Sequence, residues 1–149
     1  MIKSVRFKDL EEDPDFQGLT DEYAAEGQID GLPLAVFQKS MYKDMDDTDT
    51  FNILAGYSGG RLVGFLSIVV VVMPHNGFMM ALTESYFVGA EFRKTGMGLK
   101  LLKAGEKKAA EIGARGLMVN GPKGGRLLEV LPRIGYVENS ATYLKILED

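Results

Sequence analysis

The sequence predicts an α/β (α+β) fold on a mixed, mostly antiparallel sheet, and two features carry this prediction. Two apolar segments, 51–57 and 62–73, flank a turn of the sequence Ser-Gly-Gly-Arg, which is typical of an antiparallel hairpin. A further apolar segment, 78–88, leads into an amphipathic helical pattern at 96–112 and a short apolar segment at 117–120. This strand–helix–strand order predicts a right-handed parallel crossover beside the hairpin.

The remaining elements follow from local patterns. Residues 2–7 alternate apolar and polar side chains and predict a first strand, and Asp13-Pro14 opens a helix to about Ala25. A second helix is expected from Pro33, with apolar positions spaced by three and four residues at Leu34, Phe37, Met41 and Met45. A short helix at 126–133 and a last strand at 143–147 complete the chain. No repeat or linker divides the sequence, so we expect a single domain over residues 1–149.

Composition excludes several classes of chemistry. The chain has no cysteine and one histidine, which excludes disulfides and thiolate nucleophiles and leaves no expected metal site. The N-terminus lacks the apolar core of a signal peptide, and the apolar run 65–73 is far shorter than the ~20 residues of a membrane span. We therefore expect a cytoplasmic protein that does not enter a membrane.

Charge is unevenly distributed. Residues 1–50 hold 13 acids and 5 bases, whereas residues 51–149 hold 8 acids and 12 bases, within a net charge of −4. The net negative charge makes nucleic acid an unlikely partner. The division favours a polyanion on the second part of the chain and a cation on the first.

The segment from Val88 to Gly98 is the most informative. A strand runs into a turn that opens a helix, and the free N–H groups of a helix N-terminus suit a phosphate. Gly96 and Gly98 remove side chains that would hold a diphosphate away, while Arg93 and Lys94 are expected to add mobile positive charge. The dinucleotide fingerprint and the P-loop both fit poorly, because Leu101 replaces the fingerprint's third glycine and no Gly-Lys-Ser/Thr follows.

This segment resembles the core motif of the GNAT superfamily of acyl-CoA N-acyltransferases, in which a strand ending in Val precedes Gln/Arg-x-x-Gly-x-Gly/Ala and a helix. Val88 and Arg93–Gly98 match the motif in type and spacing, and Ile134-Gly135-Tyr136 is similar to the family's late Leu-Gly-Phe. The order of elements matches over nearly the whole chain. The resemblance implies the GNAT fold, with helices on both faces of a twisted sheet, and acetyl-CoA as the cofactor.

The resemblance also implies roles for residues of this segment. The backbone of Tyr86, Phe87 and Val88 would pair with the pantetheine arm, and Gly89 would sit at a bulge where the strand parts from its neighbour at 117–120. The diphosphate would be held by six consecutive residues: Arg93, Lys94, Thr95, Gly96, Met97 and Gly98.

Three residues are candidates for acid–base catalysis. Glu84 lies four residues before Val88, so strand alternation predicts that both side chains point to the thioester face, where Glu84 would act as the general base. The family often has a tyrosine as general acid four residues before the late Gly-Phe, but here Leu131 occupies that position. Tyr136 or Tyr143 would then supply the acid.

We therefore expect an acetyl-CoA-dependent N-acetyltransferase that acts on a primary amine by direct transfer in a ternary complex. The acidic first part favours a cationic acceptor, such as a polyamine, an aminoglycoside or a lysine side chain. Leu131 keeps open a CoA-binding module with little turnover, and a third alternative is an acyltransferase acting on a modified nucleobase or tRNA. The oligomeric state stays open, with a homodimer among the alternatives.

Overall fold

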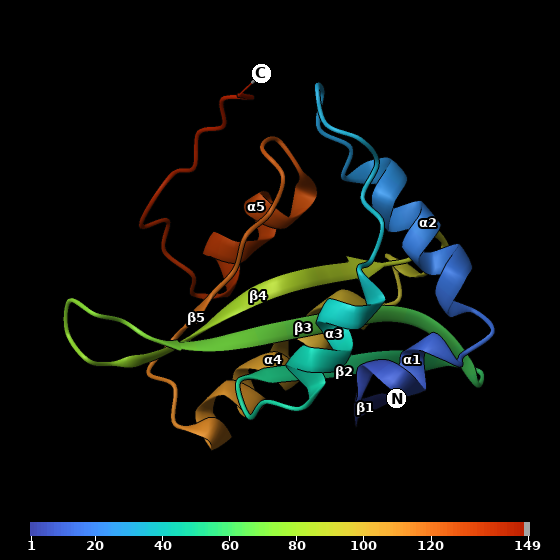
Figure 1. Cartoon of the computed structure of the whole chain (residues 1–149), viewed down its shortest axis with the longest axis horizontal. Helices are drawn as coiled ribbons and strands as arrows, with labels where there is room; N and C mark the ends of the chain where they lie inside the picture. The colour runs from blue at the N-terminus through green and yellow to red at the C-terminus, as the bar shows by residue number, and fades with distance from the viewer. Residues whose placement is uncertain (148–149) are drawn as a thin grey trace.

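The computed structural model describes residues 1–147, which form a layered α/β structure around one sheet (Figure 1). The elements follow one another as β1 (Ile2–Val5), α1 (Phe7–Glu11), α2 (Phe16–Glu26), α3 (Lys39–Asp46), β2 (Phe51–Ser58), β3 (Arg61–Val72), β4 (Met79–Val88), η1 (Ala90–Phe92), α4 (Met97–Ile112), β5 (Leu117–Met118), α5 (Arg126–Val130) and η2 (Leu131–Ile134).

The sheet is mixed, as the sequence predicts. Its five strands lie in the order β1-β2-β3-β4-β5, and the first four pair antiparallel. β5 pairs with β4 in parallel, across α4, through only two residue pairs. The parallel strand–helix–strand unit therefore lies at one edge of the sheet, and the expected GNAT architecture is confirmed.

Helices cover both faces of this sheet, and each face has its own core. The helices α1, α2 and α3 cover one face, where Phe7, Phe16 and Phe65 belong to a buried, largely aromatic cluster. On the other face α4 buries Leu101 against Leu66 and Ile68 of β3. The sheet thus separates an aromatic side from an aliphatic side.

An extra residue interrupts the pairing of β4 with β3. Thr83 pairs with Ile68 and Ser85 pairs with Ser67, so that Glu84 is the unpaired residue of a β-bulge. The bulge resets the alternation of side chains, which places Tyr86 and Val88 on the α4 face after it.

Three elements differ from the sequence predictions. The first strand ends at Val5, because Arg6 begins α1, a short helix that the alternating pattern concealed. The helix expected from Pro33 begins only at Lys39, and Phe37 instead packs among aromatic rings. The strand predicted at 143–147 does not form, since this segment pairs with no strand among the described residues.

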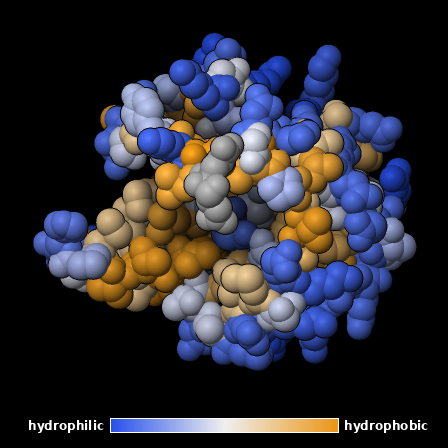
Figure 2. Space-filling model, turned by 45° about the horizontal axis from the view of Figure 1, so that its top comes forward, coloured by the Kyte–Doolittle hydropathy of each residue, from blue (hydrophilic) through white to orange (hydrophobic). Residues whose placement is uncertain are grey.

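Exposed apolar side chains gather on the connection between α2 and α3 and on the C-terminal segment. They include Ile29, Leu34 and Val36 in the connection, and Tyr143 and Leu144 after η2. Figure 2, turned toward the side that carries α2 and α5, shows apolar side chains around a hollow with a hydrophilic floor. No helix in residues 1–147 combines the length and apolarity needed to cross a membrane.

Close packing in the middle of the sheet makes Gly64 the most testable position of the fold. A Cβ there would lie 2.9 Å from the backbone oxygen of Phe87 and 3.1 Å from Leu101 Cδ1. We expect Gly64→Ala to lower the free energy of unfolding by about 1–3 kcal/mol, measured by urea denaturation. Gly18→Ala is the matched control, because its Cβ would meet nothing within 4 Å and alanine favours α2. A Gly64→Ala protein as stable as the wild type would contradict this packing.

Candidate active site

The turn between β4 and α4 depends on a left-handed glycine. The chain leaves β4 through η1 and reaches Gly96, the N-cap of α4, at φ +83°. A side chain would be strained in this conformation, so glycine is required here by the backbone. Gly98 lies in the first turn of α4, where an added Cβ would be 3.5 Å from the Tyr86 hydroxyl.

This turn presents a set of unpaired backbone donors. Among residues 1–147, no hydrogen-bond acceptor faces the N–H groups of five positions: Lys94, Gly96, Met97, Gly98 and Leu99. Free N–H groups at a helix N-terminus, with the helix dipole behind them, are suited to phosphate oxygens. The residues predicted to hold the diphosphate therefore provide a fitting cradle, made mainly of backbone.

Arg93 is not the mobile charge that the sequence suggested. Its guanidinium forms a bidentate pair with Glu26 of α2, and its Nε donates to the Val88 carbonyl at 2.9 Å. The hydrogen bond from Arg93 is the main cause that lowers the pKa of Glu26. This pair was not predictable from local patterns, because 67 residues separate its members. Lys94 keeps an exposed side chain beside the free N–H groups.

A second tie joins the same turn to α2. The N–H of Ala90 donates to the Glu22 carboxylate at 2.7 Å. Glu22 and Glu26 lie one helical turn apart, so that both carboxylates reach the turn from one face of α2. Through these two carboxylates, α2 holds the turn between β4 and α4 in place.

The edge of β4 opens just before the bulge. The last pair with β5 is Leu82–Met118, after which the N–H of Asn120 bonds only to the Thr83 hydroxyl, at 3.2 Å. From β5 the chain rises away from β4 toward α5 (Figure 1). The separation therefore begins at Thr83 and the bulge lies at Glu84, which corrects the bulge predicted at Gly89.

Beyond this point β4 keeps one free edge. The Gly89 N–H still donates to Val63 of β3 at 2.9 Å, so the N–H groups of Tyr86 and Val88 alternate to the opposite edge. Tyr86 and Val88 therefore present backbone groups on an edge that has no strand partner among residues 1–147, and the Val88 carbonyl there accepts a hydrogen bond from Arg93 Nε. This edge runs toward the glycine turn. It ends at Val88, and residues 89–93 connect it to the turn that carries the free N–H groups.

Glu84 lies on the other face from the one predicted. The bulge turns it toward α3, where the Tyr42 hydroxyl donates to Oε1 and the Ser67 hydroxyl donates to Oε2 at 2.6 Å. Val88 instead belongs to the cluster on the α4 side. The prediction that Glu84 and Val88 share a face is wrong, because simple alternation does not hold across a bulge.

A small polar network supports this carboxylate. The Ser67 and Ser85 hydroxyls lie 2.7 Å apart, and both serines are buried. Ser85 also donates its backbone N–H to Ser67 at 3.1 Å, which leaves the Ser67 proton for Glu84. A carboxylate that accepts two hydroxyl donors is held in one orientation.

The charge of Glu84 affects the pKa of two nearby tyrosines. Burial, followed by the hydrogen bond to Glu84, raises the pKa of Tyr42, and burial, followed by the charge of Glu84, raises the pKa of Tyr23. Both phenols therefore stay protonated at neutral pH, and Tyr42 can act as a donor to Glu84. Sequence reasoning missed Tyr23, Tyr42 and Ser67. The single signal was Ser67, a lone polar residue in the apolar run 65–73.

The tyrosines proposed as general acids lie elsewhere. Tyr136 donates to Glu106 of α4 at 2.8 Å, and burial together with this bond raises its pKa. Tyr143 is 93% exposed on the extended C-terminal segment, and its role stays a prediction. Leu131 is buried, so the position that departs from the family pattern is filled by core packing. Burial also raises the pKa of Tyr86 to about 12, and its hydroxyl donates to the Gly98 carbonyl at the start of α4.

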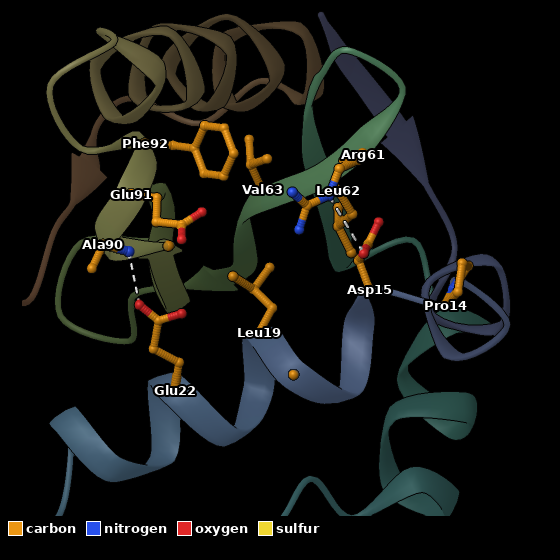
Figure 3. A pocket seen from close by; sticks show the side chains of 12 residues that line it. Pro14, Asp15, Leu19, Glu22, Arg61, Leu62, Val63, Ala90, Glu91 and Phe92 are labelled. Carbon is orange, nitrogen blue, oxygen red and sulfur yellow. Dashed lines mark hydrogen bonds and ion pairs between the residues drawn. The ribbon is translucent and has the colours of Figure 1, made fainter.

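A cavity of about 430 Å³ lies between α2, the start of β3 and η1 (Figure 3). Its charged lining consists of Asp15, Glu22, Glu91 and Arg61, with Arg61 paired to Asp15 at 3.7 Å. This excess of carboxylates does not suit a phosphate, and Glu84 does not line the cavity. Residues 1–147 contain no cluster of three or more side chains able to hold a metal ion.

Comparisons with known proteins agree with this geometry. The acetyltransferase (GNAT) family model matches residues 12–123. No curated protein matches the chain by sequence.

Similar solved structures include acetyltransferases of several kinds. An aminoglycoside acetyltransferase from an uncultured soil metagenomic sample has 18% identity and a TM-score of 0.75, over 99% of this chain and 96% of that one. A ribosomal-protein-alanine N-acetyltransferase from Brucella melitensis biovar Abortus 2308 has 18% identity and a TM-score of 0.73, over 99% of both chains. An aminoglycoside N-acetyltransferase in complex with CoA has 16% identity and a TM-score of 0.72, over 100% of both chains. At these identities the likeness establishes the fold.

The Arg93–Glu26 pair gives the site a pH-dependent contribution to stability. Because the folded state lowers the pKa of Glu26 below 4.5, the contribution is complete above about pH 5 and is lost as the pH falls through the lowered pKa. Both side chains are more than 40% exposed, so we expect Glu26→Gln to cost less than about 1 kcal/mol at neutral pH. Urea denaturation between pH 3 and 7 should show the difference from wild type shrinking at low pH. A difference that grows at low pH would contradict this account.

Proposed function

The chain belongs to the acetyltransferase (GNAT) family and is an acyl-CoA N-acyltransferase, and we propose that it transfers the acetyl group of acetyl-CoA to a primary amine in a ternary complex. The observation that carries the proposal is the free β4 edge, which leads through η1 to the unpaired N–H groups at the start of α4. A cytoplasmic location, expected from the sequence, stays a prediction.

The diphosphate of CoA fits the turn at residues 94–99. Its oxygens would accept hydrogen bonds from the free backbone donors, with Lys94 adding charge at the rim. Arg93 would instead maintain the shape of the turn through Glu26 and Val88. The pantetheine arm would pair with the backbone of Tyr86 and Val88 as an added strand does.

When bound, acetyl-CoA supplies a thioester carbonyl carbon for attack by the amine nitrogen. The new C–N bond forms as the C–S bond breaks, the amine loses one proton, and the departing thiolate gains one. Glu84 faces the side covered by α2 and α3, from which an amine can approach the gap between β4 and β5. In this proposal Glu84 takes the proton of the amine, directly or through a water.

Tyr136 is our candidate for returning a proton to the thiolate. It lies on the α4 side, where the nearby Tyr86 phenol contributes, after burial and the bond to Glu106, to raising the pKa of Tyr136. Its raised pKa keeps it protonated, as an acid must be before transfer. The buried Leu131 favours one alternative, a CoA-binding protein with little turnover, and release of free CoA in the presence of amines separates the two functions.

The cradle predicts that glycine substitutions weaken CoA binding more than loss of charge does. Gly96→Val places a β-branched side chain at φ +83° beside the free N–H groups, and we expect a loss of at least about tenfold in affinity by calorimetry. Lys94→Ala, which removes one exposed charge, should cost roughly two- to fivefold.

The control is Gly113→Val, since Gly113 has φ +102° at the far end of α4 and the same kind of strain without the cradle. Equal losses for Gly96→Val, Lys94→Ala and Gly113→Val would rule out a backbone cradle.

Glu84→Gln tests the general base, because it keeps the shape of the side chain and removes its basicity. We expect kcat to fall by roughly 10²–10⁴ while CoA affinity is unchanged, and the loss to shrink at higher pH as more amine is neutral. Thiol release measured from pH 6 to 10 checks both expectations. Wild-type turnover at neutral pH would exclude Glu84 as the base.

A further inference from the structure

Three half-buried rings stand beside Glu84 on the face covered by α2 and α3. Tyr23, Phe37 and Tyr42, here called the aromatic wall, are partly exposed rings that pack against the aromatic core. Phe37 lies 5.8 Å from Tyr23 and 5.1 Å from Tyr42 between ring centroids. Fully buried rings, including Phe65 and Phe87, support the aromatic wall from behind and fix its position.

Glu84 gives this wall a single negative charge. It is exposed, it accepts the Tyr42 hydroxyl, and it is the one carboxylate of residues 1–147 whose charge acts on both Tyr23 and Tyr42. A cation next to aromatic faces gains from the ring quadrupoles as well as from the carboxylate. The surface is therefore complementary to one ammonium group attached to a flat apolar body.

Four other acids of residues 1–50 have partners elsewhere and do not extend this charge. Glu11 pairs with Lys39 and Lys43, at 3.6 and 3.3 Å, and Asp46 accepts the Phe7 N–H at 2.7 Å. Glu22 and Glu26 accept hydrogen bonds from Ala90 and Arg93 in the turn between β4 and α4. These four carboxylates are used in capping and in tying elements together, so they do not add a second charge beside Glu84.

Apolar side chains continue the surface away from Glu84. The connection between α2 and α3 carries Ile29, Leu34 and Val36, which are between 47% and 73% exposed. Its Gly31 lies against Ile146 of the C-terminal segment, with the Ile146 Cγ1 atom 3.2 Å from the position of a Cβ. Two segments far apart in the sequence therefore meet over this side, and both contribute apolar surface.

We infer that the acceptor is a primary monoamine with an aromatic body, bound with its ring on Tyr23 and Phe37 and its nitrogen at Glu84. The inference rests on the proposed acetyl transfer and specifies its substrate class. It replaces the polyamine or aminoglycoside that the acidic composition suggested. Tyr42 is a positioning residue in this arrangement, because it acts by orienting the carboxylate.

The experiment compares an aromatic monoamine, its saturated analogue and two polycationic amines in acetyl-CoA-dependent thiol release. We expect kcat/KM for 2-phenylethylamine to exceed that for putrescine and kanamycin by at least about tenfold, and that for 2-cyclohexylethylamine by roughly two- to tenfold. Phe37→Leu, which keeps apolar volume and removes the ring, should reduce the aromatic preference and leave CoA affinity unchanged. Phe78→Ala is the control, since it removes a partly exposed ring at the β3–β4 turn.

Measuring amine binding in the absence of acetyl transfer tests the aromatic acceptor site separately from the proposed enzymatic activity. Calorimetry of 2-phenylethylamine with the CoA-loaded protein should show an affinity that Phe37→Leu and Tyr23→Leu lower by about three- to tenfold, with circular dichroism confirming that each variant folds. Acetylation of all amines without aromatic preference, or a preference for putrescine or kanamycin, would overturn this inference alone. CoA binding without acetylation of any amine, on an extended panel, would overturn the proposed function itself.

Discussion

The extra residue that β4 carries at Glu84 determines how the two faces of the sheet meet at the candidate site. Before the bulge, β4 is paired on both sides, with β3 and with β5. After it, only β3 remains as a neighbour, and the side chains of Tyr86 and Val88 point toward α4. A bulge bends a strand and increases its local twist, which is consistent with the loss of β5 at the same point. One insertion thus both opens an edge and directs a carboxylate to the opposite face.

The helix α2 couples the two halves of the site. Through Glu22 and Glu26 it holds the turn that precedes α4, and through Tyr23 it contributes to the aromatic wall beside Glu84. Tyr23 packs on Phe87, one residue before Val88, with ring centroids 5.4 Å apart. A displacement of α2 would therefore move both the turn between β4 and α4 and the aromatic wall beside Glu84. The individual ion pairs are exposed and weak, so this coupling depends mainly on the packed rings.

The sequence predicted the features that depend on local backbone. Gly96 occupies a left-handed conformation that few other residues tolerate, so the turn and the start of α4 were visible as a pattern. The face of Glu84 was not predictable in this way, because a bulge depends on pairing with Ser67, 17 residues earlier. The roles of Glu26 and Tyr42 depend on contacts over 67 and 42 residues. The segment 143–147 is mostly apolar, but an apolar segment forms a strand only where an edge of the sheet accepts it.

We propose that the opened edge of β4 and the turn before α4 together form the acetyl-CoA site. Amide hydrogen exchange with and without CoA tests this residue by residue, since bound amides are protected. We expect CoA to protect Tyr86, Val88 and residues 94–99, while the β3–β4 turn at 73–78 is unchanged. Protection confined to Gly18, Glu22 and residues 89–92, which line the α2–η1 cavity, would contradict this proposal. The ligand would then lie in that cavity and not along the edge of β4.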